Sequence, residues 1–181
     1  MKRADLRKIA VDALREYPTL ARERVYSPGA MPGWDGLYPM IRVTTPLERK
    51  QSDGPNGAPS FTTTISLLVE GTVAALDQDQ ALVDVETLCE QIERALINFT
   101  PLMRQLQQIA FVETRTETAI EGKIPLGKLT MVLGLETHES DEDFAPIVSD
   151  PLCAIDLKVA NEVCPVNIVA ETVIKVGEDH G

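Results

Sequence analysis

The sequence predicts an α+β fold, in which two helices pack on one face of a mostly antiparallel sheet and a C-terminal extension containing strands follows. A run rich in β-branched residues, 61–73, leads directly into a long helical pattern over about residues 77–98. An amphipathic pattern precedes this unit at residues 3–16, and alternating segments follow it. The order helix, strand, strand, helix, strand, strand favours two helices on one face of a sheet.

Both helical patterns place apolar residues three and four positions apart, the spacing of one face of an α-helix. In the first helix these residues are Leu6, Ile9, Ala10, Ala13, Leu14 and Tyr17. In the second they are Ala81, Val85, Leu88, Cys89, Ile92, Leu96 and Phe99. Pro18 ends the first helix, because a residue before proline is pushed out of helical geometry. We expect both stripes to face the sheet.

The strand before the β-branched run is predicted at Tyr38–Thr45 and is expected to end at Pro46. Residues 46–60 then form a polar connection rich in proline and glycine. A strand, a long loop and a second strand predict a hairpin whose tip projects into solvent. Projecting tips are where a multimeric assembly would make contacts, so this loop is the first functional candidate.

After the long helix, residues 102–108 are expected to form a short helical turn or connector. Residues 109–120 alternate apolar with threonine or charged residues and predict a half-solvated strand. The next strand, 126–137, places Leu129, Met131, Leu133 and Leu135 on one face. These elements complete a first domain, residues 1–137.

Residues 138–181 form an acidic C-terminal extension. Its first part, 138–146, is expected to be irregular, whereas 155–159 and 166–176 look like strands. Those strands would either complete the edge of the sheet or form an arm that packs on a neighbouring subunit.

The 181 residues carry a net charge of −11, and this charge is unevenly distributed. Residues 1–25 carry +3, whereas residues 134–181 carry −9. An acidic surface repels phosphate backbones, so sequence-specific nucleic-acid binding is not expected. A protein that surrounds passing DNA without gripping it is still compatible with this charge.

Neither a membrane span nor secretion is expected. The longest apolar runs fall far short of the roughly 18 residues that a membrane helix needs, and the N-terminus has no apolar signal. The three cysteines, Cys89, Cys153 and Cys164, form no metal-binding spacing and are expected to be reduced thiols. These features predict synthesis and folding in the cytoplasm.

No catalytic, metal or cofactor site is predicted. His138 stands among acidic residues, but the segment lacks the glycine and ligand spacing of a calcium loop, so a solvated turn is favoured. His180 lies at the frayed end of the chain. The sequence has no G-x-S-x-G turn, and the glycines near residues 54–57 lack the lysine of a phosphate loop. A non-enzymatic role is therefore expected.

Trp34 lies within a loop, residues 26–39, that contains three prolines and three glycines. Such a tryptophan either folds back onto the core or anchors an interface, since tryptophan is enriched at binding hot spots. The sequence leaves both interpretations open.

The element order carries a family resemblance. The segments in question are L-R-K-I-A-V-D-A-L, P-M-I-R-V-T-T, T-T-T-I-S-L-L-V-E-G, V-D-V-E-T-L-C-E-Q-I-E-R-A-L, A-F-V-E-T-R-T-E-T and L-G-K-L-T-M-V-L-G-L-E-T. Over residues 1–137 this pattern resembles the tail terminator and tail-completion (minor tail) proteins of long-tailed bacteriophages. The resemblance implies a ring of like subunits, usually six, seated on the last ring of the tail tube.

Such a ring would stop tube growth, let DNA pass through its bore and present the surface that joins the head. Its partners would be further copies of itself, the tail-tube protein and the head–tail connector protein. Its location would be the virion tail, after synthesis in the host bacterial cytoplasm from a phage or prophage genome. The segment after Thr137 is longer than the family pattern, so a head–tail connector or neck protein is the alternative. A cellular module that binds a partner or small ligand is a further one.

Ring closure is expected through a heterologous interface, in which one patch meets a different patch on the next subunit. Within the loop 46–60 we expect Arg49, Lys50 and Asp53 to contact the tube or a neighbouring subunit. The loop that carries Trp34 is the second candidate for this interface.

Overall fold

The computed structural model describes residues 2–28, 37–54, 60–121, 124–144, 154–159 and 170–175. The chain forms two compact units, Met1–Phe144 and Ala145–Gly181, and each is described by itself. The first unit therefore includes residues 138–144, seven residues beyond the expected end of the first domain. Trp34 lies outside the described residues.

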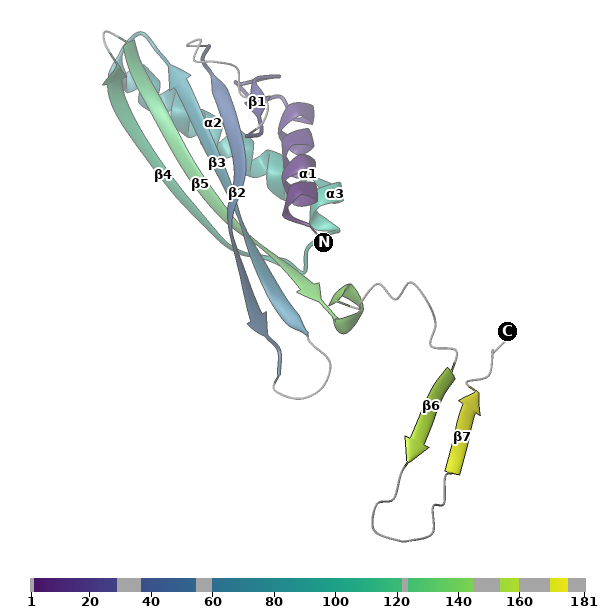
Figure 1. The fold of residues 1–181 in the computed structure, drawn as a ribbon. Coiled ribbons are helices and arrows are strands. Elements are labelled where there is room, and N and C mark those ends of the chain that lie inside the picture. Colours follow the sequence, from purple (N-terminus) through teal and green to yellow (C-terminus); the bar gives the residue numbers. More distant parts are fainter. Residues whose placement is uncertain are drawn as a thin grey trace. The chain divides into compact units, whose positions relative to one another are not determined.

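The first unit has the predicted α+β architecture, with helices packed against one face of a five-stranded sheet (Figure 1). The strand order is β1-β2-β3-β5-β4, and every neighbouring pair is antiparallel except β1 with β2. The elements are α1 (Arg3–Glu16), β1 (Val25–Tyr26), β2 (Met40–Ser52), β3 (Phe61–Ala74), α2 (Gln78–Ile97), α3 (Thr100–Met103), β4 (Gln108–Glu121), β5 (Ile124–Glu139) and the 3₁₀ turn η1 (Asp141–Phe144).

One hydrophobic core joins the helices to the sheet. The apolar stripes of α1 and α2 meet alternate residues of the central strands, as the sequence predicts. The fully buried side chains include Leu6, Leu14, Ile65, Leu67, Leu88, Ile92, Leu96, Leu129, Met131 and Leu133. Cys89 and Phe99, at the margin of the α2 stripe, are only partly buried. The core thus lies between α1, α2 and the middle of β3 and β5.

Both long helices run over the predicted residues. Asp77 caps α2, because its side-chain carboxylate accepts a hydrogen bond from the Gln80 backbone N–H at 2.8 Å. Close approach to the sheet depends on Gly127, where an added Cβ would lie 2.5 Å from the Ala81 carbonyl oxygen. Helix α2 therefore lies directly on the backbone of β5.

The predicted end of β2 at Pro46 is wrong. The strand continues to Ser52, and the polar residues 47–52 pair with β3. The pairing register shifts between Thr44 and Leu47, and Pro46 falls within this irregularity. Proline is tolerated at such bulges because the ladder hydrogen bond that it cannot donate is absent there. Residues 46–52 of the predicted loop are therefore strand, and residues 55–59 of it lie outside the described residues.

Strand β4 also differs from expectation. It was predicted to be half-solvated, but its side chains are almost all exposed on both faces, with only Ile109 and Ala119 partly buried. The reason is its position at the outer edge of the sheet, beyond the main cover of the helices.

The segment 138–146 was predicted to be irregular, yet β5 extends to Glu139 and η1 covers Asp141–Phe144. The predicted connector at 102–108 is a short helix, α3, that begins at Thr100 and ends at Met103.

The second unit contains β6 (Ala154–Val159) and β7 (Ala170–Lys175), which pair antiparallel with each other. Within this unit they form a two-stranded sheet of their own. The arm interpretation stays a prediction. The alternative in which they complete the edge of the first sheet also stays a prediction.

Candidate assembly surface

Three strands of the first unit continue past the start of α1 (Figure 1). We call residues 48–54, 60–64 and 136–144 the projecting end. Ser52 pairs with Phe61, and Phe61 pairs with Glu139, so β2, β3 and β5 reach this end together. Strand β4 reaches only the border of this end, because its first residue, Gln108, pairs with Glu136. The projecting end is thus a three-stranded extension of the sheet.

Lys50 is held within the projecting end by two acidic residues. Its ammonium group donates a hydrogen bond to Glu139 and lies 3.5 Å from a carboxylate oxygen of Glu48. It also lies 5.1 Å from the centre of the Phe144 ring. The hydrogen bond to Glu139 raises the pKa of Lys50, against a smaller opposing effect of burial. Arg3 at the start of α1 extends the cluster through Glu48, at 3.1 Å.

Glu139 is the most buried charged group of this cluster, with 8% of its surface exposed. Burial alone would raise its pKa, but hydrogen bonds from Lys50 and Thr63 together outweigh it and hold the pKa of Glu139 below its ordinary value. The Thr63 hydroxyl donates at 2.8 Å. Glu139 therefore remains a carboxylate that ties β2, β3 and β5 together.

Phe144 closes one side of this cluster. Its ring meets that of Phe61 edge to face, with 5.5 Å between the ring centres and 72° between the ring planes. The short turn η1 carries Phe144 back over the end of the sheet, so residues just beyond β5 help to fix the hairpin.

Asp53 begins the turn between β2 and β3 and accepts two hydrogen bonds. The Ser60 hydroxyl donates at 2.7 Å and the Thr62 hydroxyl at 2.8 Å, and these bonds lower the pKa of Asp53. His138 Nδ1 lies 3.5 Å from the same carboxylate. Among the described contacts the serine donates to the aspartate and not to the histidine, so this is not the serine–histidine pair that nucleophilic catalysis requires. The group stabilises the turn.

The side chain of Arg49 differs in its contacts from those of Lys50 and Asp53, the other two residues predicted in this loop. Lys50 and Asp53 are engaged within the projecting end, whereas Arg49 is exposed and makes no hydrogen bond or ion pair to another described residue. It pairs with Thr64 in the ladder, and Leu47, 60% exposed, lies two residues earlier on the same face. Of the predicted residues that the structure describes, Arg49 is the one with its side chain free to contact another molecule.

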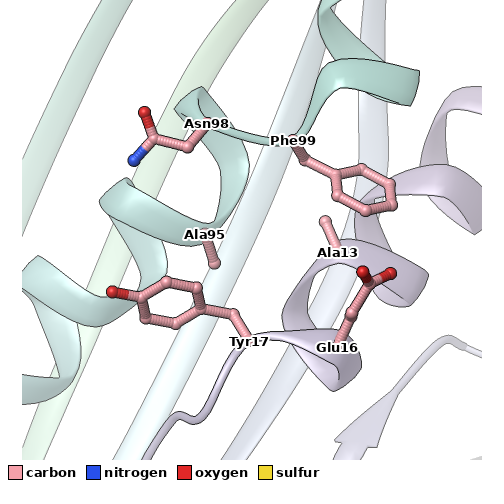
Figure 2. Close-up of a pocket in the computed structure, with 6 residues that line it drawn as sticks. All are labelled: Ala13, Glu16, Tyr17, Ala95, Asn98 and Phe99. Atoms are coloured by element: carbon pink, nitrogen blue, oxygen red, sulfur yellow. The ribbon is translucent and has the colours of Figure 1, made fainter.

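A shallow hollow of about 230 Å³ lies between the C-terminal ends of α1 and α2 (Figure 2). Its lining consists of Ala13, Glu16, Tyr17, Ala95, Asn98 and Phe99. The rings of Tyr17 and Phe99 flank the two alanines. The lining thus combines apolar and aromatic surface with the polar side chains of Glu16 and Asn98, a composition that suits a contact surface.

Within the described ranges, no group of three or more His, Cys, Asp or Glu side chains is placed to hold a metal ion. No helix in those ranges is long and apolar enough to span a membrane.

Comparison with models of known protein families gives no match, and comparison with curated proteins gives none either.

Sequence reasoning placed three candidate residues in this region but missed those that hold it together. Glu48 and Lys50 face the same side as Thr63 and Glu139 only because the bulge near Pro46 changes the alternation of β2. Phe144 gave no periodic signal, since it lies in a single turn outside the sheet. Lys50 and Phe144 lie far apart in the sequence, so no local pattern indicates their contact.

Proposed function

We propose that the chain is a non-enzymatic assembly protein of a bacteriophage tail, one subunit of a ring that caps the tail tube and offers the head-joining surface. The observation that carries this proposal is the projecting end. It extends past the start of α1, is fixed by its own polar and aromatic contacts, and leaves Arg49 exposed, with exposed Leu47 just before it in β2.

Internal bonding matters for such a role because a contact surface that is already ordered loses less conformational entropy when it binds. Lys50, Glu139 and Asp53 fix the strands and the turn in the free subunit. Arg49 can then meet an acidic or polar group on a neighbour without first being released from an internal partner.

A closed ring requires a heterologous contact, in which the projecting end of one subunit meets a different surface on the next. The hollow between α1 and α2 is one surface of suitable character, since Tyr17 and Phe99 give it an aromatic lining. The net charge of −11 supports a ring that surrounds DNA without holding it, because acidic surfaces release few counterions from DNA.

A neck or head–tail connector protein is the second candidate. The observation that favours it is the second unit, which adds a two-stranded sheet after the residues that resemble the terminator pattern. Additional folded surface suits a protein with partners on both the tail side and the head side.

The test is electron microscopy of the purified chain mixed with tail tubes of the phage that encodes it. We expect closed rings, with a bore wide enough for duplex DNA, at one end of each tube. Rings bound to the portal side of heads instead would establish the neck alternative. Tubes and heads that both remain without bound protein would contradict the proposal.

A further inference from the structure

Strand β4 is a long edge with one neighbour. It runs from Gln108 to Glu121 and pairs only with β5 among the described strands. The outward backbone N–H and C=O groups of an edge strand are free to pair with another chain. Its side chains are exposed on both faces, so a further strand could approach without displacing a helix.

We propose that β4 pairs with β4 of a second copy of this chain, antiparallel, about a two-fold axis that passes beside Thr116. The partner is inferred from the residues that this register brings opposite one another. It places Arg115 opposite Glu117 of the second copy, Thr114 opposite Thr118, and Val112 opposite Ile120, and each of these pairs occurs twice.

These cross-strand residue pairs are complementary on both faces of β4. Thr114 is near Cys89 of α2, so residues 112, 114, 116, 118 and 120 lie on the helix side. That side would carry apolar and threonine pairs, both favourable across strands. Val112 and Ile120, now 39% and 59% exposed, would cover each other. The opposite side would carry two Arg–Glu pairs.

Neighbouring registers lack this complementarity. An axis beside Arg115 sets the two Arg115 side chains against each other and Glu113 against Glu117, which are like charges directly opposite. An axis beside Thr114 keeps opposite charges together, Arg115 against Glu113, but it sets Val112 against Thr116 and Ile120 against Gln108, so no apolar side chain covers another on the helix side. The register centred on Thr116 is therefore the one that the sequence of β4 specifies.

This pairing is separate from the proposed tail function. Residues 112–120 of β4 lie opposite residues 125–133 of β5, away from the projecting end that begins at Glu136. A two-fold pair would thus leave Arg49 and the hairpin turn accessible. Dimerisation of the purified chain can be measured without any tail component. The dimer proposal can therefore be refuted while the tail function stands, and the reverse.

The first experiment is disulfide trapping of the full chain. In an antiparallel pair, opposite Cα atoms lie about 4.5–5.5 Å apart, within the range that a disulfide spans. We expect Thr116→Cys to cross-link to itself under mild oxidation. Thr114→Cys and Thr118→Cys should each fail alone but cross-link when mixed. All variants carry Cys89→Ser, because Thr114 lies near Cys89 and a cysteine at position 114 could otherwise bond to it within one chain. The Cys89→Ser chain, oxidised alongside, controls for the two remaining native cysteines.

The second experiment reverses charges at exposed positions. Arg115→Glu and Glu117→Arg each create two like-charged pairs and should weaken the dimer roughly tenfold or more. An equimolar mixture of the two variants restores both opposite-charge pairs and should dimerise as the parent does, as measured by sedimentation. A chain that stays monomeric at every concentration, or cross-links through Thr114→Cys alone, would overturn the proposal.

Discussion

The helix-covered half of the sheet and its projecting end use the same sheet face in different ways. Under the helices, that face carries Leu67, Val69 and Met131, all fully buried. Past the start of α1 it carries Lys50, Thr63 and Glu139, joined by hydrogen bonds. The change occurs where helical cover stops. One continuous sheet therefore provides both a folding core and a separate polar end.

The two regions should contribute very differently to stability. Full burial of one leucine side chain stabilises a fold by about 1.5–3 kcal/mol, whereas an exposed ion pair contributes about 0–1 kcal/mol. Most of the folding free energy then lies in the covered half. Substitutions at the projecting end can alter contacts while leaving the fold intact.

The largest effect is expected from Leu67→Ala. Leu67 is fully buried in β3, and its truncation should lower the free energy of unfolding by about 2–5 kcal/mol by leaving a cavity. Urea denaturation followed by circular dichroism measures it. Leu76→Ala, at a position 97% exposed, is the control and should change stability by less than about 0.5 kcal/mol. Equal losses in the free energy of unfolding for the two variants would show that Leu67 is not part of the core.

A smaller loss is expected from Gly127→Ala. The added methyl group would lie 2.5 Å from the backbone oxygen of Ala81, so α2 must move off the sheet, at a cost of about 1–3 kcal/mol. Gly54→Ala adds the same methyl group at the projecting end, where no described residue other than its chain neighbours has an atom within 4 Å. Thermal unfolding of both variants separates the crowded position from the open one. An unchanged Gly127→Ala protein would show that α2 does not lie so close.

The smallest effect is expected from Glu139→Gln, which keeps the shape of the side chain but removes its charge. At neutral pH it should lower stability by about 1 kcal/mol, since a hydrogen bond between charged groups is lost at a partly solvated site. The pKa of Glu139 is lowered in the folded state, so its charge stabilises the fold above the unfolded-state value of about 4.3.

That stabilisation is lost as the pH falls through the lower folded-state pKa of Glu139, where the carboxylate is protonated. The stability difference between the parent and Glu139→Gln should therefore be constant near neutral pH and shrink in acid. Urea denaturation of both proteins between about pH 7 and about pH 3 measures it. A difference that grows in acid would contradict the sign of the pKa shift.

The sequence predicted the covered half well because its signals are periodic and uninterrupted. The stripes of α1 and α2 and the alternation Leu129–Leu135 all mark one buried face. It failed at Pro46 because proline usually ends a central strand, whereas here a bulge at the same place absorbs it. It misjudged β4 because alternation shows which residues share a face and not whether anything covers that face.

The sequence predicted where the candidate site lies along the chain, but not the contacts that its residues make. The breaker-rich segment located the hairpin, and Arg49, Lys50 and Asp53 were chosen from it together. Their different surroundings depend on the register of β2 with β3 and on Phe144, far along the chain. The residues around Arg49 indicate neither the register of β2 with β3 nor the contact with Phe144. The sequence therefore could not distinguish Arg49 from Lys50 and Asp53, which have partners within the chain.

The most direct measurement of the central claim is the length distribution of tail tubes assembled with increasing amounts of this chain. We expect the parent protein and Arg49→Lys to arrest growth at a uniform length, because both keep a cation at the projecting end. Arg49→Glu, folded to the same stability, should leave tubes of unrestricted length. Tubes that grow equally long with and without the parent protein would show that this chain does not cap them.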